Sequence, residues 1–160
     1  MTTSLEALRQ QFPLPGNVEW IGVRPARELP MSVREQAVLN KSGMAGDRFN
    51  AKRNDTRTVT LIQAEHLVAL ASLLRRERID PAELRRNIVV SGINLLALKG
   101  QCFKVGAAVL EMTGLCHPCS KMERRLGPGA YNAMRGHGGI TARVITAGTI
   151  ALGDEVLVSR

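Results

Sequence analysis

Residues 103–112 read Phe103-Lys104-Val105-Gly106-Ala107-Ala108-Val109-Leu110-Glu111-Met112, and this stretch decides the fold class of the chain. Two short apolar runs, 103–105 and 108–112, flank a turn that contains a glycine, which is the pattern of paired strands. Further strands are expected over residues 141–146 and 150–159, again with turn glycines between them. Short strands at close spacing with few helices predict a mainly β (α+β) fold, either a barrel or a bent, partly closed sheet.

Outward from this stretch, the N-terminal half supplies more strands. Residues 17–24, 58–62 and 88–90 are expected to be extended, and residues 31–38 form a less regular candidate. Residues 41–48 are expected to be a loop, because their two glycines can adopt positive φ.

Helices are expected at three places in the N-terminal half, and a further short helical stretch is expected with the cysteine segment, between the strands over residues 108–112 and 141–146. Thr3 as N-cap and Glu6 three residues later have the spacing of a capping box, and Pro13 stops that helix. Asp80, Pro81 and Glu83 have the same signature for a short second helix. Between them, residues 63–78 are expected to form a helix whose apolar stripe consists of Leu67, Leu70, Leu73 and Leu74.

Length and charge limit the classes of protein. The 160 residues suit one domain with a real core, and the net charge is +8, with arginine supplying most of the basic residues. This excess favours either an anionic partner or a solvated basic surface. Residues 1–20 contain no continuous apolar run, so neither a signal peptide nor a membrane span is expected. Three cysteines, an odd number, are read as thiols of a reducing cytoplasm.

The most informative local motif is Gly114-Leu115-Cys116-His117-Pro118-Cys119-Ser120-Lys121-Met122-Glu123. Pro118 stiffens the backbone that enters Cys119. An ammonium such as that of Lys121 favours a thiolate, the form of cysteine that attacks sulfur or binds metal. The motif therefore indicates a reactive site rather than a core position.

Three other interpretations of Cys116 and Cys119 stay open. They could be half of a zinc site, but Cys102, His66 and His137 are isolated and offer no paired second half. They could be a thioredoxin-like redox pair, although that motif belongs between a strand and a helix of a βαβ unit, and the surroundings here are rich in β-structure. They could also be two small buried residues.

The basic motifs are weak when taken singly. Gly46-Asp47-Arg48 follows a loop and puts a carboxylate beside a guanidinium, as a solvated turn would. Arg85-Arg86-Asn87 ends the second short helix, where basic residues favour the helix dipole. The glycines of residues 136–139 do not have the spacing of a phosphate-binding loop and are consistent with a turn before a strand.

Taken together and in order, these pieces resemble the MOSC family, the domain found at the C-terminus of molybdenum-cofactor sulfurases. The resemblance covers about residues 18–158, leaves residues 1–17 as an N-terminal helical extension, and marks the chain as a standalone, bacterial-type single MOSC domain over residues 1–160. The matching stretches are Gly46–Arg48, Arg57–Gln63, Arg85–Leu95, Gly106–Glu111, Pro118–Lys121, Gly138–Val144, Gly148 and Gly153–Asp154.

The resemblance implies a MOSC-type β-barrel, similar to the pyruvate kinase β-barrel domain, with a few short helices. It also implies an essential cysteine, here Cys119, which ligates molybdenum in a pterin cofactor or hands on sulfur. Arg48, Arg86 and Asn87 are the candidates to hold the pterin phosphate, since planar donors suit phosphate oxygens. Lys121 is a further candidate at the cofactor site, and Cys116 is a secondary thiol outside the family pattern.

Besides Cys116, the chain departs from the family pattern in two further respects. Phe49 follows Gly46-Asp47-Arg48 where histidine is expected. The cysteine desulfurase domain that binds pyridoxal phosphate is not in the sequence, so this chain is not expected to bind pyridoxal phosphate directly.

The leading hypothesis is a cytoplasmic MOSC domain that binds molybdenum cofactor (molybdopterin) or carries persulfide sulfur on Cys119. Its activity would resemble a sulfurtransferase, with a cysteine desulfurase as partner. The alternative is a molybdenum-dependent reductase of N-hydroxylated substrates, served by an electron-transfer partner. A basic nucleic-acid-binding module is a second alternative. The chain has only five aromatic residues, too few to favour a platform on which bases stack. No membrane partner is expected.

Overall fold

The computed structural model describes residues 2–49, 52 and 56–159. The strands are β1 (Gly16–Val23), β2 (Ser32–Arg34), β3 (Gln36–Asn40), β4 (Gly43–Met44), β5 (Val59–Gln63), β6 (Ile88–Ser91), β7 (Cys102–Val105), β8 (Ala108–Leu115), β9 (Ile140–Thr146), β10 (Gly148–Ala151) and β11 (Glu155–Val158). The helices are α1 (Leu5–Arg9), α2 (Ala64–Leu73), α3 (Pro81–Leu84), α4 (Ser120–Leu126) and α5 (Ala130–Met134), with a 3₁₀ turn η1 (Leu95–Leu98).

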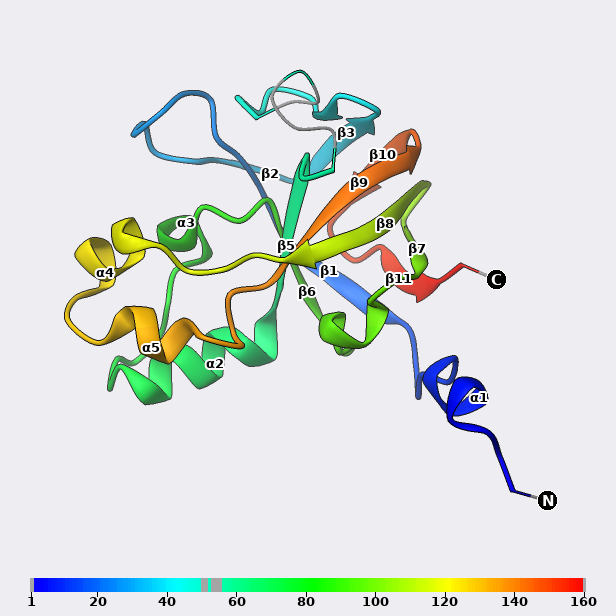
Figure 1. Cartoon of the computed structure of the whole chain (residues 1–160). Helices are drawn as coiled ribbons and strands as arrows, with labels where there is room; N and C mark the ends of the chain where they lie inside the picture. The colour runs from blue at the N-terminus through cyan, green and yellow to red at the C-terminus, as the bar shows by residue number, and fades with distance from the viewer. Residues whose placement is uncertain (1, 50–51, 53–55, 160) are drawn as a thin grey trace.

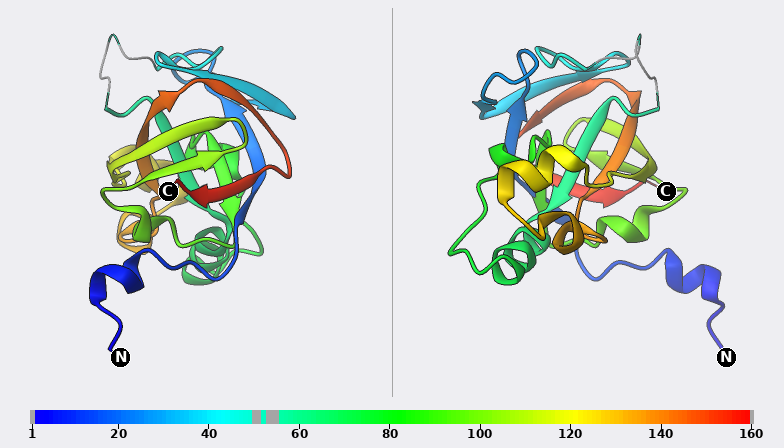
Figure 2. Two further views of the ribbon diagram at one scale, coloured as in Figure 1. Left: turned by 90° about the vertical axis from the view of Figure 1, so that its right-hand side faces the viewer. Right: turned by 60° about the vertical axis from the view of Figure 1, so that its left-hand side comes forward.

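The strands β1, β11, β7, β8, β9, β5 and β6 follow one another around a closed barrel, because β11 pairs with both β7 and β1 (Figure 2, left). Strand β2 adds to β1 outside this ring, and β10, β3 and β4 form a separate small sheet. Neighbours in the barrel are antiparallel except β5 and β6, which are parallel. The mainly β-barrel fold expected from the sequence is therefore confirmed.

The parallel pair β5–β6 explains the presence of helices α2 and α3. Parallel neighbours need a crossover, and α2 and α3 supply it between Gln63 and Ile88. Every residue of β5 is buried, since one face of the strand lines the barrel and the other lies under helices. Leu61 belongs to the barrel core, whereas its neighbour Ile62 belongs to a second core with Leu70 and Met122.

Helices α2, α3, α4 and α5 gather at one side of the barrel, while α1 lies apart near the N-terminus (Figure 1). Helix α3 has the expected capping box, with Asp80 accepting from the Ala82 N–H and Glu83 accepting from the Asp80 N–H. None of the described helices is long and apolar enough to cross a membrane.

Several expected boundaries were wrong for local reasons. The N-cap of α1 is Ser4, not Thr3, since the Ser4 hydroxyl accepts from the Ala7 N–H at 3.1 Å. Helix α2 ends at Leu73, five residues before the expected end at residue 78, because Arg75 adopts φ +54°. Leu73, which was expected in the apolar stripe of this helix, is exposed. Residues 31–38 divide into β2 and β3.

Two further differences concern short strands. Residues 150–159 divide into β10 and β11, because Gly153 turns the chain with φ +84°. The expected loop over residues 41–48 contains the two-residue strand β4, which pairs with β3 through Leu39 and Met44.

Candidate active site

The segment that carries Cys116 and Cys119 links strand β8 to helix α4. The N–H of Cys116 donates to the carbonyl of Gly139 at 2.9 Å, so the β8–β9 pairing continues one residue beyond β8. Cys119 is the N-cap of α4, and its carbonyl accepts from the Met122 N–H at 3.0 Å. The Cys119 side chain is exposed and makes no capping hydrogen bond, whereas that of Cys116 is buried. Cys119 is therefore the thiol of this pair that an external ligand can reach.

This placement bears on the alternatives for the two cysteines. The motif lies between strand β8 and helix α4, in agreement with the short helical stretch expected after it. However, β8 and the following β9 are antiparallel, so the unit is not the parallel βαβ unit of a thioredoxin. Among the described residues, no group of three or more His, Cys, Asp and Glu side chains is placed to hold a metal ion. A metal at Cys119 would have to bring its other ligands with it.

Arg86 lies behind this segment, at the corner between α3 and β6. Its Nε donates to the Gly138 carbonyl at 2.8 Å and its Nη1 to the Leu84 carbonyl at 2.8 Å. Its Nη2 is buried and has no hydrogen-bond partner within the described part of the chain. Burial lowers the pKa of Arg86, while Cys116 and Cys119 raise it. A buried cation with a free donor favours an anion or a strong acceptor next to it.

Gly138 brings the cysteine segment and Arg86 together. A Cβ at this position would lie 2.3 Å from the Cys116 carbonyl oxygen and 3.6 Å from Arg86 Nη2. The first of these distances is shorter than any real non-bonded carbon–oxygen contact. The close approach of the segments around Cys116 and Gly138 therefore requires glycine at position 138. Gly138, in the glycine-rich turn before β9, therefore has a structural reason.

The backbone of Arg85 explains why Arg85 and Arg86 have different surroundings. Arg85 ends α3 in the left-handed region, with φ +58°. Its guanidinium donates to the carbonyls of Ala26 and Leu29, so it holds the loop that follows β1. Arg86, one residue later, turns to Gly138 instead. One short motif thus supplies one cation to the loop that follows β1 and one buried cation behind the cysteine segment.

A network of buried polar groups centres on Asp47. Arg24 contacts both carboxylate oxygens of Asp47, with Nη2 to Oδ2 at 2.7 Å and Nε to Oδ1 at 3.1 Å. Asn87 Nδ2 donates to Asp47 Oδ1 at 3.1 Å and to the Gly22 carbonyl at 3.2 Å. Asn87 Oδ1 accepts from the Thr60 N–H at 3.1 Å. The Asn87 amide is thus fully engaged with protein groups, and it fixes the corner that precedes β6 rather than offering a free donor.

Phe49, the departure from the expected histidine, belongs to the same network. Its N–H donates to Asp47 Oδ2 at 3.1 Å, and its ring centroid lies 5.8 Å from the Arg24 guanidinium carbon. The carboxylate of Asp47 therefore pairs with Arg24, 23 residues away, and the ring of Phe49 gives that guanidinium a cation–π contact.

Arginines gather beside this network. Burial lowers the pKa of Arg85, and the charges of Arg125, Arg24 and Arg48 lower it further, while Asp47 raises it. Guanidiniums that lower the pKa of Arg85 in this way lie within electrostatic range of it. A groove of about 410 Å³ adjoins the cluster, and it is lined by Arg85 and Arg125 together with Glu28, Leu29, Pro30, Met31, Ala82 and Glu83.

The structure places the sequence-predicted residues as follows. Arg86 is within electrostatic range of Cys116 and Cys119, and Arg48 is within range of Arg85. Lys121 is half-buried in the first turn of α4. Asn87 is buried in the Asp47 network.

Sequence reasoning missed Arg24 and Arg125. Arg24 directly follows strand β1 and precedes Pro25, and Arg125 lies in helix α4 among other basic residues. Neither position has a local signal, since each acquires its neighbours only through the tertiary fold. The groove beside Arg85 was missed for the same reason.

Two histidines lie beside the site. The rings of His66, on α2, and His137, after α5, form an edge-to-face pair with centroids 4.9 Å apart. His137 Nδ1 lies 3.0 Å from the Ala133 carbonyl. Burial lowers the pKa of His66 and His137 lowers it further, against an opposite effect of Glu65.

We expect this histidine pair to make stability depend on pH. Since the folded-state pKa of His66 lies below its ordinary value of 6.5, the unfolded chain binds more protons as the pH falls through that window. The contribution to stability is complete above pH 6.5 and is lost as the pH drops towards the folded-state pKa. Urea unfolding at a series of pH values should show this decline, and His66→Gln should reduce it. A decline unchanged in His66→Gln, or reduced equally by His117→Gln at an exposed histidine, would contradict the assignment.

Comparison with known proteins agrees with this architecture. The model of the MOSC domain family matches residues 48–157, so the chain belongs to the MOSC family. The YuaD protein of Bacillus subtilis superimposes with a TM-score of 0.77 at 19% identity, over 89% of this chain and 94% of that one. YiiM of Escherichia coli superimposes with a TM-score of 0.72 at 17% identity, over 92% and 71%.

YiiM of Geobacillus stearothermophilus gives a TM-score of 0.70 at 18% identity, over 91% of this chain and 76% of that one. At these identities the likeness concerns the fold alone. No curated protein matches the sequence.

Proposed function

We propose that this MOSC domain binds the molybdenum cofactor, or carries sulfur destined for it, through the thiolate of Cys119. The observation that supports this proposal best is the buried Nη2 of Arg86, which has no hydrogen-bond partner among the described residues and lies within electrostatic range of Cys116 and of the exposed thiol of Cys119. The two groups together form a soft sulfur ligand with a fixed positive charge behind it. Such a pair suits an anionic ligand that carries a thiophilic metal or a sulfane sulfur.

The chain's donor groups fit the cofactor at two points. At one end, Cys119 offers a single thiolate, which is enough for a metal whose remaining ligands belong to a pterin. At the other end, Arg85 and Arg125 line the groove of about 410 Å³ and offer planar donors to a phosphate. Cys119 is the N-cap of α4 and Arg125 lies six residues further on, about 9 Å along the helix axis. When bound, the cofactor would supply a metal centre that accepts electrons or sulfur.

The chain's own residues account for sulfur carriage without further groups. The Cys119 thiolate attacks the outer sulfur of a donor persulfide, forms a Cys119 persulfide and releases the donor as a thiolate. The S–S bond of the donor breaks and a new S–S bond forms, so no oxidant is needed. Arg86 would stabilise the negative charge on the Cys119 sulfur before and after this step, because its free Nη2 has no competing acceptor.

The test uses the full-length chain purified without added thiols. If the chain retains the cofactor, oxidation of its extract should give the fluorescent product of molybdopterin. If it carries sulfur, mass spectrometry after proteolysis should show a mass gain of one sulfur on the peptide that contains Cys119. Retained molybdopterin with reduction of an N-hydroxylated substrate would favour the alternative, a molybdenum-dependent reductase. Absence of both signals, with no uptake of either species on reconstitution, would contradict the proposal.

We expect Cys116 to be secondary. It is buried and continues the β8–β9 pairing through its backbone, so its thiol serves packing. Cys116→Ala should keep sulfur loading and cofactor binding under reducing conditions, at a cost of about 1 kcal/mol in the free energy of unfolding. Loading by mass spectrometry and urea unfolding measure the two effects. A loss of loading as complete as that of Cys119→Ser would instead indicate a paired redox or metal site.

A further inference from the structure

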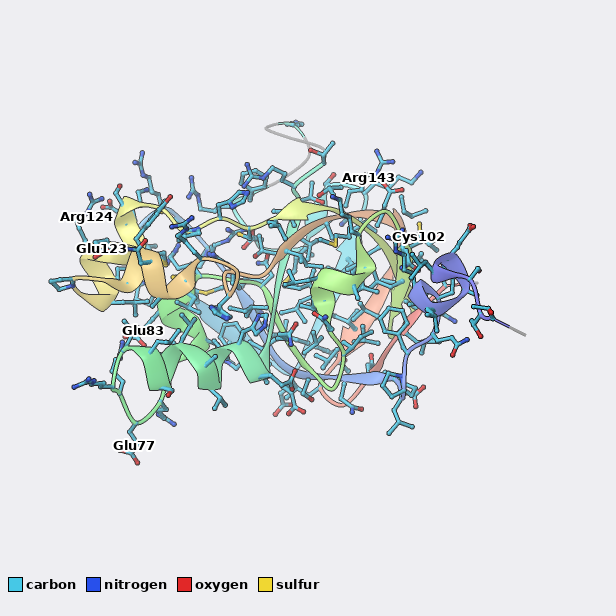
Figure 3. The ribbon with its side chains drawn as sticks, turned by 60° about the horizontal axis from the view of Figure 1, so that its bottom comes forward. Glu77, Glu83, Cys102, Glu123, Arg124 and Arg143 are labelled. Carbon is cyan, nitrogen blue, oxygen red and sulfur yellow. The ribbon has the colours of Figure 1, made fainter. Side chains whose placement is uncertain are left out.

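The outer surface of helices α4 and α5 is basic. Arg124 and Arg135 are exposed and Lys121 is half-exposed, and α4 and α5 contact each other. Figure 3 shows Arg124 at the end of the molecule formed by these helices, with Cys102 and Arg143 at the opposite end. We call the surface formed by Lys121, Arg124, Tyr131 and Arg135 the α4–α5 face.

Among the described residues, no carboxylate forms an ion pair with Lys121, Arg124 or Arg135. The Glu123 carboxylate accepts from the backbone N–H groups of Gly129 and Tyr131, and thereby ties the start of α5 to α4. Glu83 pairs with Arg76 at 3.0 Å and completes the capping box of α3. The positive charge of Arg124 and Arg135 is therefore directed to solvent.

An apolar component accompanies the charge. Tyr131, the only tyrosine of the chain, is 46% exposed on α5, and Leu115, the last residue of β8, is 44% exposed. Exposed tyrosine next to exposed arginine is the composition that protein interfaces favour at their energetic centres. The face thus has the chemistry of a surface that binds another protein carrying negative charge.

We propose that the α4–α5 face docks an acidic protein that exchanges sulfur with Cys119. This inference rests on the proposed function, because it assigns the partner of that same thiol. Cys119 is the N-cap of α4, so the thiol lies at the N-terminal end of the helix that carries Lys121 and Arg124, and the partner must extend past the first turn of α4 to reach it. In the discharge step, the partner's thiolate attacks the outer sulfur of the Cys119 persulfide. It becomes a persulfide itself and leaves Cys119 as a thiolate.

The experiment uses two fluorescein-labelled peptides of equal length, each with one cysteine, one rich in glutamate and one with glutamine in its place. Fluorescence anisotropy measures their binding to the wild-type chain, to Arg124→Glu/Arg135→Glu and to Lys99→Glu/Lys104→Glu. The last variant makes the same change of charge at two exposed lysines on and before β7, away from α4. We expect the glutamate peptide to bind the first variant about tenfold more weakly than the wild type, with a strong dependence on salt. The Lys99→Glu/Lys104→Glu control should retain most of the affinity.

A second measurement follows sulfur transfer from polysulfide-loaded Cys119 to each peptide by mass spectrometry. The Arg124→Glu/Arg135→Glu variant should slow transfer to the glutamate peptide and leave transfer to 2-mercaptoethanol unchanged. Equal losses of peptide affinity in the two charge variants would overturn the proposed face. It would also be overturned if a DNA duplex bound the wild type more tightly than the glutamate peptide does and lost as much affinity in Arg124→Glu/Arg135→Glu. Failure of Cys119 to load at all would contradict the proposed function alone, since the anisotropy measurement needs no persulfide.

Discussion

Replacing Cys119 by serine should reduce sulfur loading and cofactor retention to background. The hydroxyl has nearly the same volume as the thiol, but it neither forms a persulfide nor provides a soft ligand for molybdenum. Because Cys119 is exposed and its side chain makes no capping hydrogen bond, the fold should not depend on the sulfur. We expect the free energy of unfolding to stay within about 0.5 kcal/mol of the wild type.

The chain contains a matched control for this substitution. Cys102 is also a free, accessible thiol, and it lies at the opposite end of the barrel (Figure 3). Cys102→Ser should therefore keep full loading, measured as a mass gain of one sulfur, and full retention of molybdopterin fluorescence. If Cys119→Ser loads as well as Cys102→Ser, the reactive thiol has been assigned to the wrong residue.

Replacing Arg86 should have the next largest effect, and it should act on both ligand binding and stability. Arg86→Ala removes the free Nη2 donor, so affinity for the anionic ligand should fall by a factor of about ten to a hundred, or about 1.5–3 kcal/mol. It also leaves the Leu84 and Gly138 carbonyls without their donors in a buried setting, which should lower the free energy of unfolding by about 2–4 kcal/mol. Ligand titration and urea unfolding measure the two losses separately.

Two further variants separate charge from geometry. Arg86→Lys keeps the charge but cannot reach Gly138, Leu84 and a ligand at once, so it should recover only part of the affinity. Arg143→Ala removes a half-buried arginine that pairs with Glu111 at 2.8 Å at the other end of the molecule, and should not change ligand affinity appreciably. Full ligand affinity in a folded Arg86→Ala protein would return Arg86 to a purely structural role.

Much of the architecture could be predicted because it depends on neighbouring residues. The capping box of α3 needs only Asp80, Pro81 and Glu83, and the hairpin of β7 and β8 needs only alternating apolar residues and a turn glycine. Where local preference competed with packing, the prediction erred. Helix α2 was expected to continue to residue 78, but Arg75 turns the chain so that Ile79 and Leu84 can reach the second core.

In the candidate site, too, the features that depend on neighbouring residues could be predicted, and those that depend on distant residues could not. The stiff Pro118–Cys119 step and the basic motif at residues 85–87 are visible in the sequence because each is a short run whose chemistry does not depend on distant partners. Only the tertiary structure decided that Asp47 pairs with Arg24, that the Asn87 amide is fully engaged, and that Arg86 has a free donor beside the thiols. These facts depend on barrel closure, which brings residues 24, 47, 87, 119 and 138 to one end, and no local preference encodes contacts across such separations.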